Sequence, residues 1–198
     1  MQKNGTVVII HGYKSSPRDC WFPWLKKELE KRWYDVKIPK MPHPARPKVS
    51  AWIKTIRHTV STVSPTTYFV GHSLGAMTII RYLETIQSKE KIGGAIFVAG
   101  RFITRSTKSK VSGFFDKKIN WKKVKNSAKK FVGIYSLDDP LVSTENGRLI
   151  GQKLEAKFVL EKHKGHFSRD DKIFKLPVVL KELLLLSKKD KEDVSRET

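Results

Sequence analysis

Residues 68–77 decide the fold, and they read Tyr68-Phe69-Val70-Gly71-His72-Ser73-Leu74-Gly75-Ala76-Met77. The residues before the first glycine have strand character. After the second glycine the apolar residues change to helical spacing, with Ala76, Ile79, Ile80 and Leu83 at positions i, i+3, i+4 and i+7. The stretch therefore predicts a strand, a sharp turn and a helix.

A Gly-x-Ser-x-Gly turn between a strand and a helix is typical of a nucleophile elbow. Gly71 and Gly75 let the strand and the helix approach closely, and we expect Ser73 to have a strained backbone and an exposed hydroxyl. The helix N-terminus and the next N–H point to where negative charge develops during attack on a carbonyl. A glycine-bounded turn with an N-cap serine is the alternative, and the flanking strand and helix favour the elbow.

Five further short apolar runs are typical of strands, and helical patterns alternate with them. The economical arrangement is a mostly parallel six-stranded sheet with right-handed crossovers and helices on both faces, which makes the fold class α/β. We expect one domain over residues 1–186 and a charged, frayed tail over 187–198. The predicted strands beside the elbow strand cover residues 6–10, 34–39, 94–99, 131–135 and 157–160, and the helices 17–33, 49–63, 143–154 and 177–186.

The composition excludes several kinds of site and location. Cys20 is the single cysteine, so an internal disulfide and a thiolate zinc site are excluded and a reducing compartment fits. No stretch approaches the roughly 18 apolar residues of a membrane span, and the N-terminus lacks a long apolar signal region. We therefore expect a cytoplasmic protein without a membrane span.

The charge is strongly positive, with 40 Lys and Arg against 19 Asp and Glu and a formal net charge of +21. Such an excess favours an anionic partner, whereas the preference for Lys over Arg argues against base readout in nucleic acid. Eleven of the basic residues fall in the segment 101–130, which contains Asp116 as its single acid. We expect this segment to form a cap with a positive rim beside the site. One interpretation is a solvated lysine face, and the other is a rim that attracts acidic substrates or an anionic surface.

A serine nucleophile needs a base and an acid, placed after later strands in the order Ser, acid, His. The strand at 131–135 is followed by Asp138 and Asp139, and the strand at 157–160 by His163 and His166. Asp139 precedes a proline in a turn that would aim its side chain inward, while Asp138 suits a local cap. His166 follows a glycine that lets the backbone bring the ring close. We therefore assign the acid to Asp139 and the base to His166, with His163 on the solvated rim.

The oxyanion of an acyl intermediate needs two N–H donors. One is assigned to the backbone of Leu74, which follows the serine, and the other to the backbone of Tyr13 in the loop after the first strand. His11 is expected to support that loop rather than exchange protons. The scheme requires no cofactor and no metal.

Several motifs together resemble the small serine hydrolases of the YdeN and retinoblastoma-binding-protein-nine type. The resemblance spans most of the chain and implies an α/β-hydrolase fold with a minimal cap, and Ser73, Asp139 and His166 as a catalytic triad. The motifs that carry it are His11-Gly12-Tyr13, Trp21-Phe22-Pro23-Trp24-Leu25, Met41-Pro42, the elbow itself, Gly113-Phe114-Phe115, Trp121, Asp138-Asp139-Pro140 and Gly165-His166-Phe167.

The residues and the resemblance together predict a serine hydrolase that cleaves a small ester, thioester or amide through an acyl-serine intermediate. A carboxylesterase-like activity is favoured, and a peptidase or amidase uses the same machinery. Two alternatives stay open: an acyltransferase with the same triad, and a binding protein on a hydrolase scaffold that docks an anionic partner through its basic surface.

Overall fold

The computed structural model describes residues 3–60, 62–103 and 110–188, and six strands within them form one sheet in the order β2-β1-β3-β4-β5-β6. All neighbouring strands are parallel, which confirms the predicted sheet. Its strands are β1 (Gly5–Ile10), β2 (Tyr34–Lys37), β3 (Thr67–His72), β4 (Ile92–Val98), β5 (Ala128–Ser136) and β6 (Lys157–Glu161).

The strand order determines where loops gather. Because all strands are parallel, their carboxyl ends lie at one edge of the sheet. The chain moves from β1 outward to β2 and then returns past β1 to β3, so the order reverses between β1 and β3. The loops that leave the carboxyl ends on either side of such a reversal diverge, and a crevice forms between them.

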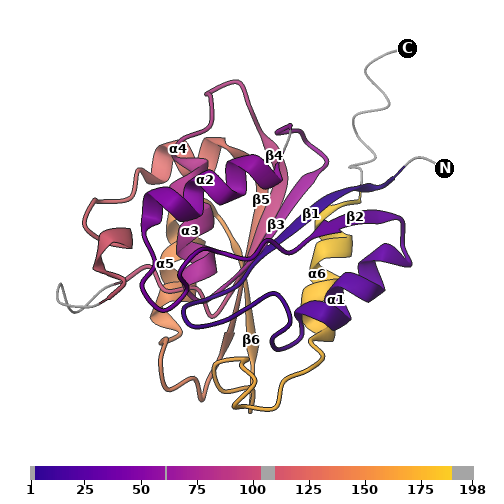
Figure 1. Cartoon of the computed structure of the whole chain (residues 1–198), viewed down its shortest axis with the longest axis vertical. Coiled ribbons are helices and arrows are strands. Elements are labelled where there is room, and N and C mark those ends of the chain that lie inside the picture. Colours follow the sequence, from indigo (N-terminus) through magenta and orange to yellow (C-terminus); the bar gives the residue numbers. More distant parts are fainter. Residues whose placement is uncertain (1–2, 61, 104–109, 189–198) are drawn as a thin grey trace.

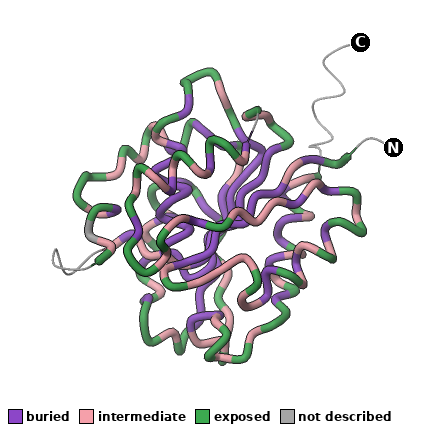
Figure 2. The backbone as a smooth tube through the Cα atoms, in the orientation of Figure 1, coloured by how far each residue is buried: buried purple, intermediate pink, exposed green. Residues whose placement is uncertain are grey.

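Helices cover both faces of the sheet, as predicted. Figure 1 shows α1 and α6 together on one side, and α2, α3, α4 and α5 on the other. Each layer closes its own apolar core against the sheet, and Figure 2 shows the buried backbone running along the central strands. The helices are α1 (Phe22–Glu30), α2 (Val49–Thr59), α3 (Leu74–Leu83), α4 (Trp121–Asn126), α5 (Glu145–Leu154) and α6 (Pro177–Leu186).

The first helix is shorter than the predicted helix over 17–33. It begins at Phe22 because the carboxylate of Asp19 accepts hydrogen bonds from the Ser16 N–H at 2.7 Å and the Ser15 hydroxyl at 3.1 Å. These bonds hold the preceding residues in a turn. The second helix likewise ends at Thr59, earlier than the predicted boundary at 63.

Strand β4 begins two residues before the predicted strand over 94–99. It includes Gly93, where an added Cβ would lie 2.4 Å from the Pro65 carbonyl oxygen. In α6 the buried side chains are Val179, Glu182, Leu183 and Leu186, whereas Leu180 and Leu184 are only half-buried. Glu182 is buried in place of an apolar residue because it pairs with Lys157 of β6.

Several sequence expectations concern residues outside the description. The tail beyond Lys188 and residues 104–109 of the expected cap are among them. The described part of the connection between β4 and β5 consists of a 3-10 turn, η1 (Ser112–Phe114), and α4. No helix among the described residues combines the length and the apolar character needed to cross a bilayer.

The tightest packing in the sheet layer is between the start of α3 and the end of β1. An added Cβ on Gly75 would lie 2.1 Å from the Ile10 carbonyl oxygen and 2.8 Å from that of His11. Both neighbours are backbone atoms, so they cannot move aside as a flexible side chain would. Only glycine permits the helix to begin this close to the strand.

We expect Gly75→Ala to lower the free energy of unfolding by about 1–3 kcal/mol or more, because the new methyl group overlaps backbone. This reverses the usual rule that alanine stabilises a helix by up to about 1 kcal/mol relative to glycine. Chemical denaturation of both proteins measures the difference.

Gly151→Ala in α5 is the matched control. Its added Cβ would lie 3.7 Å from the Ala156 carbonyl oxygen, an ordinary contact, so this substitution should be neutral or stabilising. Equal effects of the two substitutions would contradict the packing argument.

Candidate functional site

Ser73 connects β3 to α3 in a backbone conformation that few residues adopt. Its φ is 53° and its ψ is −118°, and its side chain makes no capping hydrogen bond to the helix. The Ser73 N–H donates to the Val98 carbonyl oxygen at 2.9 Å, which ties the strained residue to β4. Such strain persists only where the surroundings hold it, and here it keeps the half-buried hydroxyl at the carboxyl edge of the sheet.

Asp139 and His166 meet at the same edge, from the loops after β5 and β6. Nδ1 of His166 lies 2.9 Å from Oδ2 of Asp139, whose side chain is completely buried. The other oxygen, Oδ1, accepts the N–H groups of Leu141 at 2.8 Å and Val142 at 3.0 Å. Because a carboxylate accepts, Nδ1 carries the ring proton and Nε2 presents its lone pair.

The competing residues serve other purposes or lie apart. Asp138 is exposed and accepts hydrogen bonds from the Ser136 hydroxyl at 2.5 Å and the Lys164 N–H at 3.2 Å. The Ser136 hydroxyl, and to a smaller extent the backbone N–H groups near it, hold the pKa of Asp138 below its usual value. His163 is exposed. Asp138 therefore joins the loops after β5 and β6, and Asp139 alone of the two acids contacts the His166 ring.

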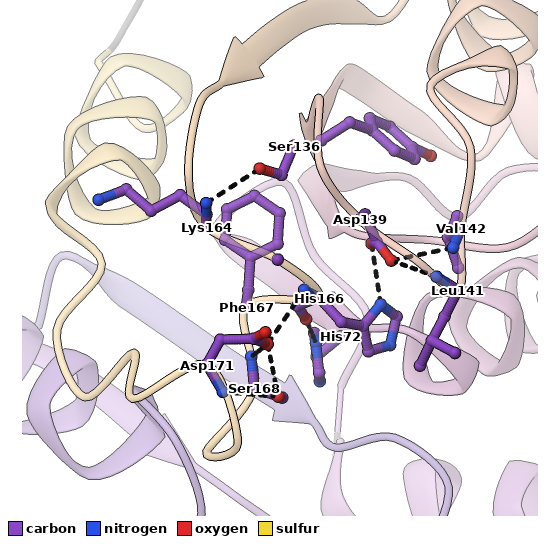
Figure 3. Close-up of polar contacts among 12 residues, drawn as sticks. His72, Ser136, Asp139, Leu141, Val142, Lys164, His166, Phe167, Ser168 and Asp171 are labelled. Carbon is purple, nitrogen blue, oxygen red and sulfur yellow. Dashed lines mark hydrogen bonds and ion pairs between the residues drawn. The ribbon is translucent and has the colours of Figure 1, made fainter.

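His72, the residue before the serine, also belongs to this site and had no role in the sequence prediction. Its Nε2 lies 2.8 Å from the His166 carbonyl oxygen, and the two rings are 5.0 Å apart. Figure 3 shows His72 beside the loop that carries His166. A carbonyl can only accept, so Nε2–H donates, and Nδ1 has no partner among the described residues. The sequence signal that could have identified His72 is a titratable residue at the end of an otherwise apolar strand.

Asp171 is a second residue that the sequence reading missed. Its Oδ2 accepts from the His166 N–H at 3.0 Å, and from the Ser168 N–H at 2.9 Å and hydroxyl at 2.5 Å (Figure 3). Partial burial acts to raise the pKa of Asp171, but the hydrogen bonds from Ser168 and His166 outweigh it, and the pKa is lowered. Gly165 has a φ of +50°, and an added Cβ there would lie 2.0 Å from Asp171 Oδ1. The loop therefore requires glycine at this position.

The loop after β1 reaches the serine. An added Cβ on Gly12 would lie 3.2 Å from the Ser73 Cβ, so the backbone that leads into Tyr13 passes beside Ser73. His11 is completely buried and accepts the Met41 N–H at Nε2, 3.1 Å away, while its Nδ1 lies 2.9 Å from the Gly12 carbonyl oxygen. Both ring nitrogens are therefore used in holding the loop. Leu74 opens α3, where the first N–H groups have no partner in the helix.

Two described lysines of the segment 101–130 lie away from the site. Lys122 and Lys123 line a surface cavity with Gln87 and Ser127, which precede β4 and β5. That cavity lies at the amino ends of the strands, opposite the edge that carries Ser73. The chain reverses direction between β4 and β5, so the later part of the segment is carried away from the site.

Arg101, at the start of this segment, lies near the site. It lines a cavity of about 240 Å³ together with Asp139, Leu141 and Asn146. Asn146 is buried and its Oδ1 accepts the N–H groups of Phe102 at 2.7 Å and Ile103 at 2.9 Å. The loop after β4 is thereby fixed against α5. Within the described residues no group of three His, Cys, Asp or Glu side chains is arranged to hold a metal ion.

Acid should destabilise the protein through His72. Complete burial lowers the pKa of His72 to about 3 from 6.5, so between these values the unfolded chain binds a proton that the folded chain does not. The free energy of unfolding therefore falls as the pH drops below 6.5, by on the order of a few kcal/mol in full. Burial lowers the pKa of His11 as well, which adds to the same trend.

We expect His72→Gln to flatten this loss of stability between pH 6.5 and roughly 4.5, above the range where most carboxylates titrate. Glutamine retains an N–H donor for the His166 carbonyl but does not titrate. Urea denaturation at a series of pH values gives the slopes, with His163→Gln as a control for removal of an exposed imidazole. An unchanged slope in His72→Gln would contradict the assignment.

The chain is also similar to known proteins. The family model described as serine hydrolase matches residues 7–184. The YdeN hydrolase of Bacillus subtilis is 35% identical over 173 residues, which cover 87% of this chain and 91% of YdeN. Serine hydrolase RBBP9 of Rattus norvegicus is 26% identical over 168 residues, or 84% of each chain.

Solved structures place the fold in the same group. The crystal structure of the B. subtilis ydeN gene product has a TM-score of 0.87 at 34% identity and covers 92% of this chain and 98% of its own. Est1E from Butyrivibrio proteoclasticus, at 13% identity, has a TM-score of 0.72 with 94% and 89% coverage, and shares the fold. The chain is therefore an α/β hydrolase that belongs to the serine hydrolase family.

Proposed function

We propose that this serine hydrolase cleaves a small ester, thioester or amide through an acyl-serine intermediate, with Ser73 as nucleophile, His166 as base and Asp139 as acid. The observation that supports this most is the 2.9 Å contact between His166 Nδ1 and the buried Asp139 carboxylate. A buried carboxylate bound to two backbone N–H groups is held in one orientation, and so is the ring it contacts. A carboxylesterase-like reaction is the simplest one for this arrangement.

Acylation begins when the Ser73 oxygen attacks the substrate carbonyl carbon and its proton passes to Nε2 of His166. The carbonyl π electrons move onto oxygen, and the N–H groups of Tyr13 and Leu74 donate to the resulting oxyanion. When the tetrahedral intermediate collapses, the bond to the leaving group breaks. The leaving group takes the proton from Nε2, and the acyl group stays on Ser73.

Deacylation repeats these steps with water. His166 Nε2 removes a proton from water, the hydroxyl attacks the acyl carbon, and the Ser73 oxygen leaves with the proton from the imidazolium. Asp139 stabilises the positive charge that the ring carries in each half-reaction. His72 holds the backbone carbonyl of His166 through a neutral side chain, so it adds no second positive charge beside the imidazolium.

We expect Ser73→Ala to abolish both labelling by a fluorophosphonate probe and hydrolysis of p-nitrophenyl esters of short acyl chains. Asp139→Asn and His166→Ala should each lower kcat by on the order of 10³ or more, because triad members act as a unit. Asp138→Asn and His163→Ala are the matched neighbours and should cost far less. A reversed ranking within either pair would overturn that assignment, and labelling that survives Ser73→Ala would overturn the nucleophile.

Any preference for acidic substrates should depend on Arg101, because this residue lines the cavity beside Asp139. With a carboxylate-bearing ester, Arg101→Gln should raise KM about tenfold or more, the loss of one charge-assisted hydrogen bond. The neutral analogue should be unaffected. Lys122→Gln with Lys123→Gln is the control at the opposite edge, and an equal effect there would favour general attraction by the net charge.

A further inference from the structure

Strand β6 is an edge of the sheet, and it is far more open than the other strands. Every residue of β3 and β4 is buried, whereas Phe158 is 37% exposed and Leu160 is 44% exposed. Exposed edge strands carry unpaired backbone groups that can pair with another strand.

The backbone groups that face outward can be identified. The Leu137 N–H donates to the Glu161 carbonyl oxygen at 3.1 Å, so Glu161 directs its backbone groups towards β5. Hydrogen-bonding direction alternates along a strand, so Lys157 and Val159 also face β5. Phe158 and Leu160 therefore direct their N–H and C=O groups away from the sheet.

The side chains alternate between the two faces. Phe158 lies against α5, because a Cβ added to Gly147 of that helix would lie 2.2 Å from the Phe158 ring. The Phe158 ring also lies 5.9 Å from the Tyr135 ring. Lys157 lies on the other face, where its ammonium is 2.8 Å from both carboxylate oxygens of Glu182 in α6. Figure 1 shows β6 between these two helices. Leu160 consequently shares the face of Phe158, and Glu161 that of Lys157.

We propose that β6 pairs antiparallel with β6 of a second copy of this chain, about a two-fold axis at Val159. The sequence Lys157-Phe158-Val159-Leu160-Glu161 is self-complementary in this register. Phe158 comes opposite the partner's Leu160, and these residues supply the outward N–H and C=O groups of two hydrogen-bonded pairs. Lys157 comes opposite the partner's Glu161.

Each part of this register provides a contact for a group that is exposed in the described part of the single chain. The two cross-strand pairs of Phe158 and Leu160 cover apolar surface that is otherwise exposed, and such pairs contribute roughly 0.2–1 kcal/mol each beyond alanine. The Lys157 side chain is 53% exposed, and its third donor is available for a carboxylate. A net charge of +21 opposes self-association, so local opposite charges at both ends of the strand favour this partner.

Sedimentation velocity of the full chain from low to high micromolar concentration tests the proposal at physiological salt. The wild type should show a monomer–dimer equilibrium. Hydrogen exchange at the amides of Phe158 and Leu160 should slow as the dimer forms. A monomer throughout, or a dimer that leaves both amides unprotected, would overturn the proposal.

Three variants separate the contributions. Leu160→Lys places a charge opposite the partner's Phe158, Leu160→Pro removes an outward N–H at an edge position that tolerates proline, and Glu161→Lys sets like charges against each other. Each should weaken the dimer at least about tenfold. Trp33→Lys is the matched control, since Trp33 is 53% exposed and precedes β2 at the opposite edge of the sheet, and it should dimerise like the wild type. A dimer that persists in Leu160→Lys and Leu160→Pro would refute the interface.

Probe labelling of Ser73 provides the folding control for the same variants. Because β6 contributes no residue to the proposed chemistry, monomeric variants should label as fast as the wild type. If the chain does not dimerise, the proposed hydrolase reaction still stands. If the wild type is not labelled, the proposed dimer still stands.

Discussion

The start of α3 packs against the end of β1 at a distance that admits no side chain, and this contact determines the geometry of the site. The carbonyl oxygens of Ile10 and His11 occupy the space where a Cβ of residue 75 would lie. The helix N-terminus is thereby brought beside the loop after β1. Ser73 must complete the turn within one residue, which is why its φ is positive. Ser73, the helix N-terminus and the backbone beside Tyr13 meet through this one approach.

The histidine loop is held mainly through its backbone. The His72 imidazole donates to the His166 carbonyl, the Asp171 carboxylate accepts the His166 N–H, and the Trp21 indole donates to the Phe167 carbonyl at 3.2 Å. Phe167 itself is completely buried with a φ of 55°. These contacts come from three different parts of the chain, and they leave the His166 ring free to bond Asp139. The role proposed for His166, as a base that transfers protons repeatedly, benefits from a backbone that does not move.

Many basic residues in one segment of the sequence do not by themselves place positive charge at the site. A lysine-rich connection that leaves a strand at the catalytic edge must return to the opposite edge before the next parallel strand begins. Lys122 and Lys123 lie on that return, beside Ser127 at the start of β5. Arg101 stays near Asp139 because it directly follows β4 and because Asn146 holds the adjacent backbone. In a parallel sheet, a residue of a connecting segment therefore lies near the carboxyl edge when it closely follows the end of a strand.

The sequence by itself determined the order of elements, the parallel sheet and the elbow. Apolar runs and helical spacing are local signals, and a glycine on each side of Ser73 is a local steric requirement. The order Ser, acid, His also indicated which loops to consider, and it limited each choice to two neighbours.

The tertiary structure determined the contacts between residues that are distant in the chain. It brought Asp139 to the His166 ring and Asp138 to the Lys164 N–H, a distinction set by loop geometry. It revealed His72 and Asp171, whose roles depend on carbonyl and N–H groups that have no signature in sequence. It also left β6 open, because an apolar run reads the same in the middle of a sheet and at its edge, and only the absence of a neighbouring strand among the described residues separates the two.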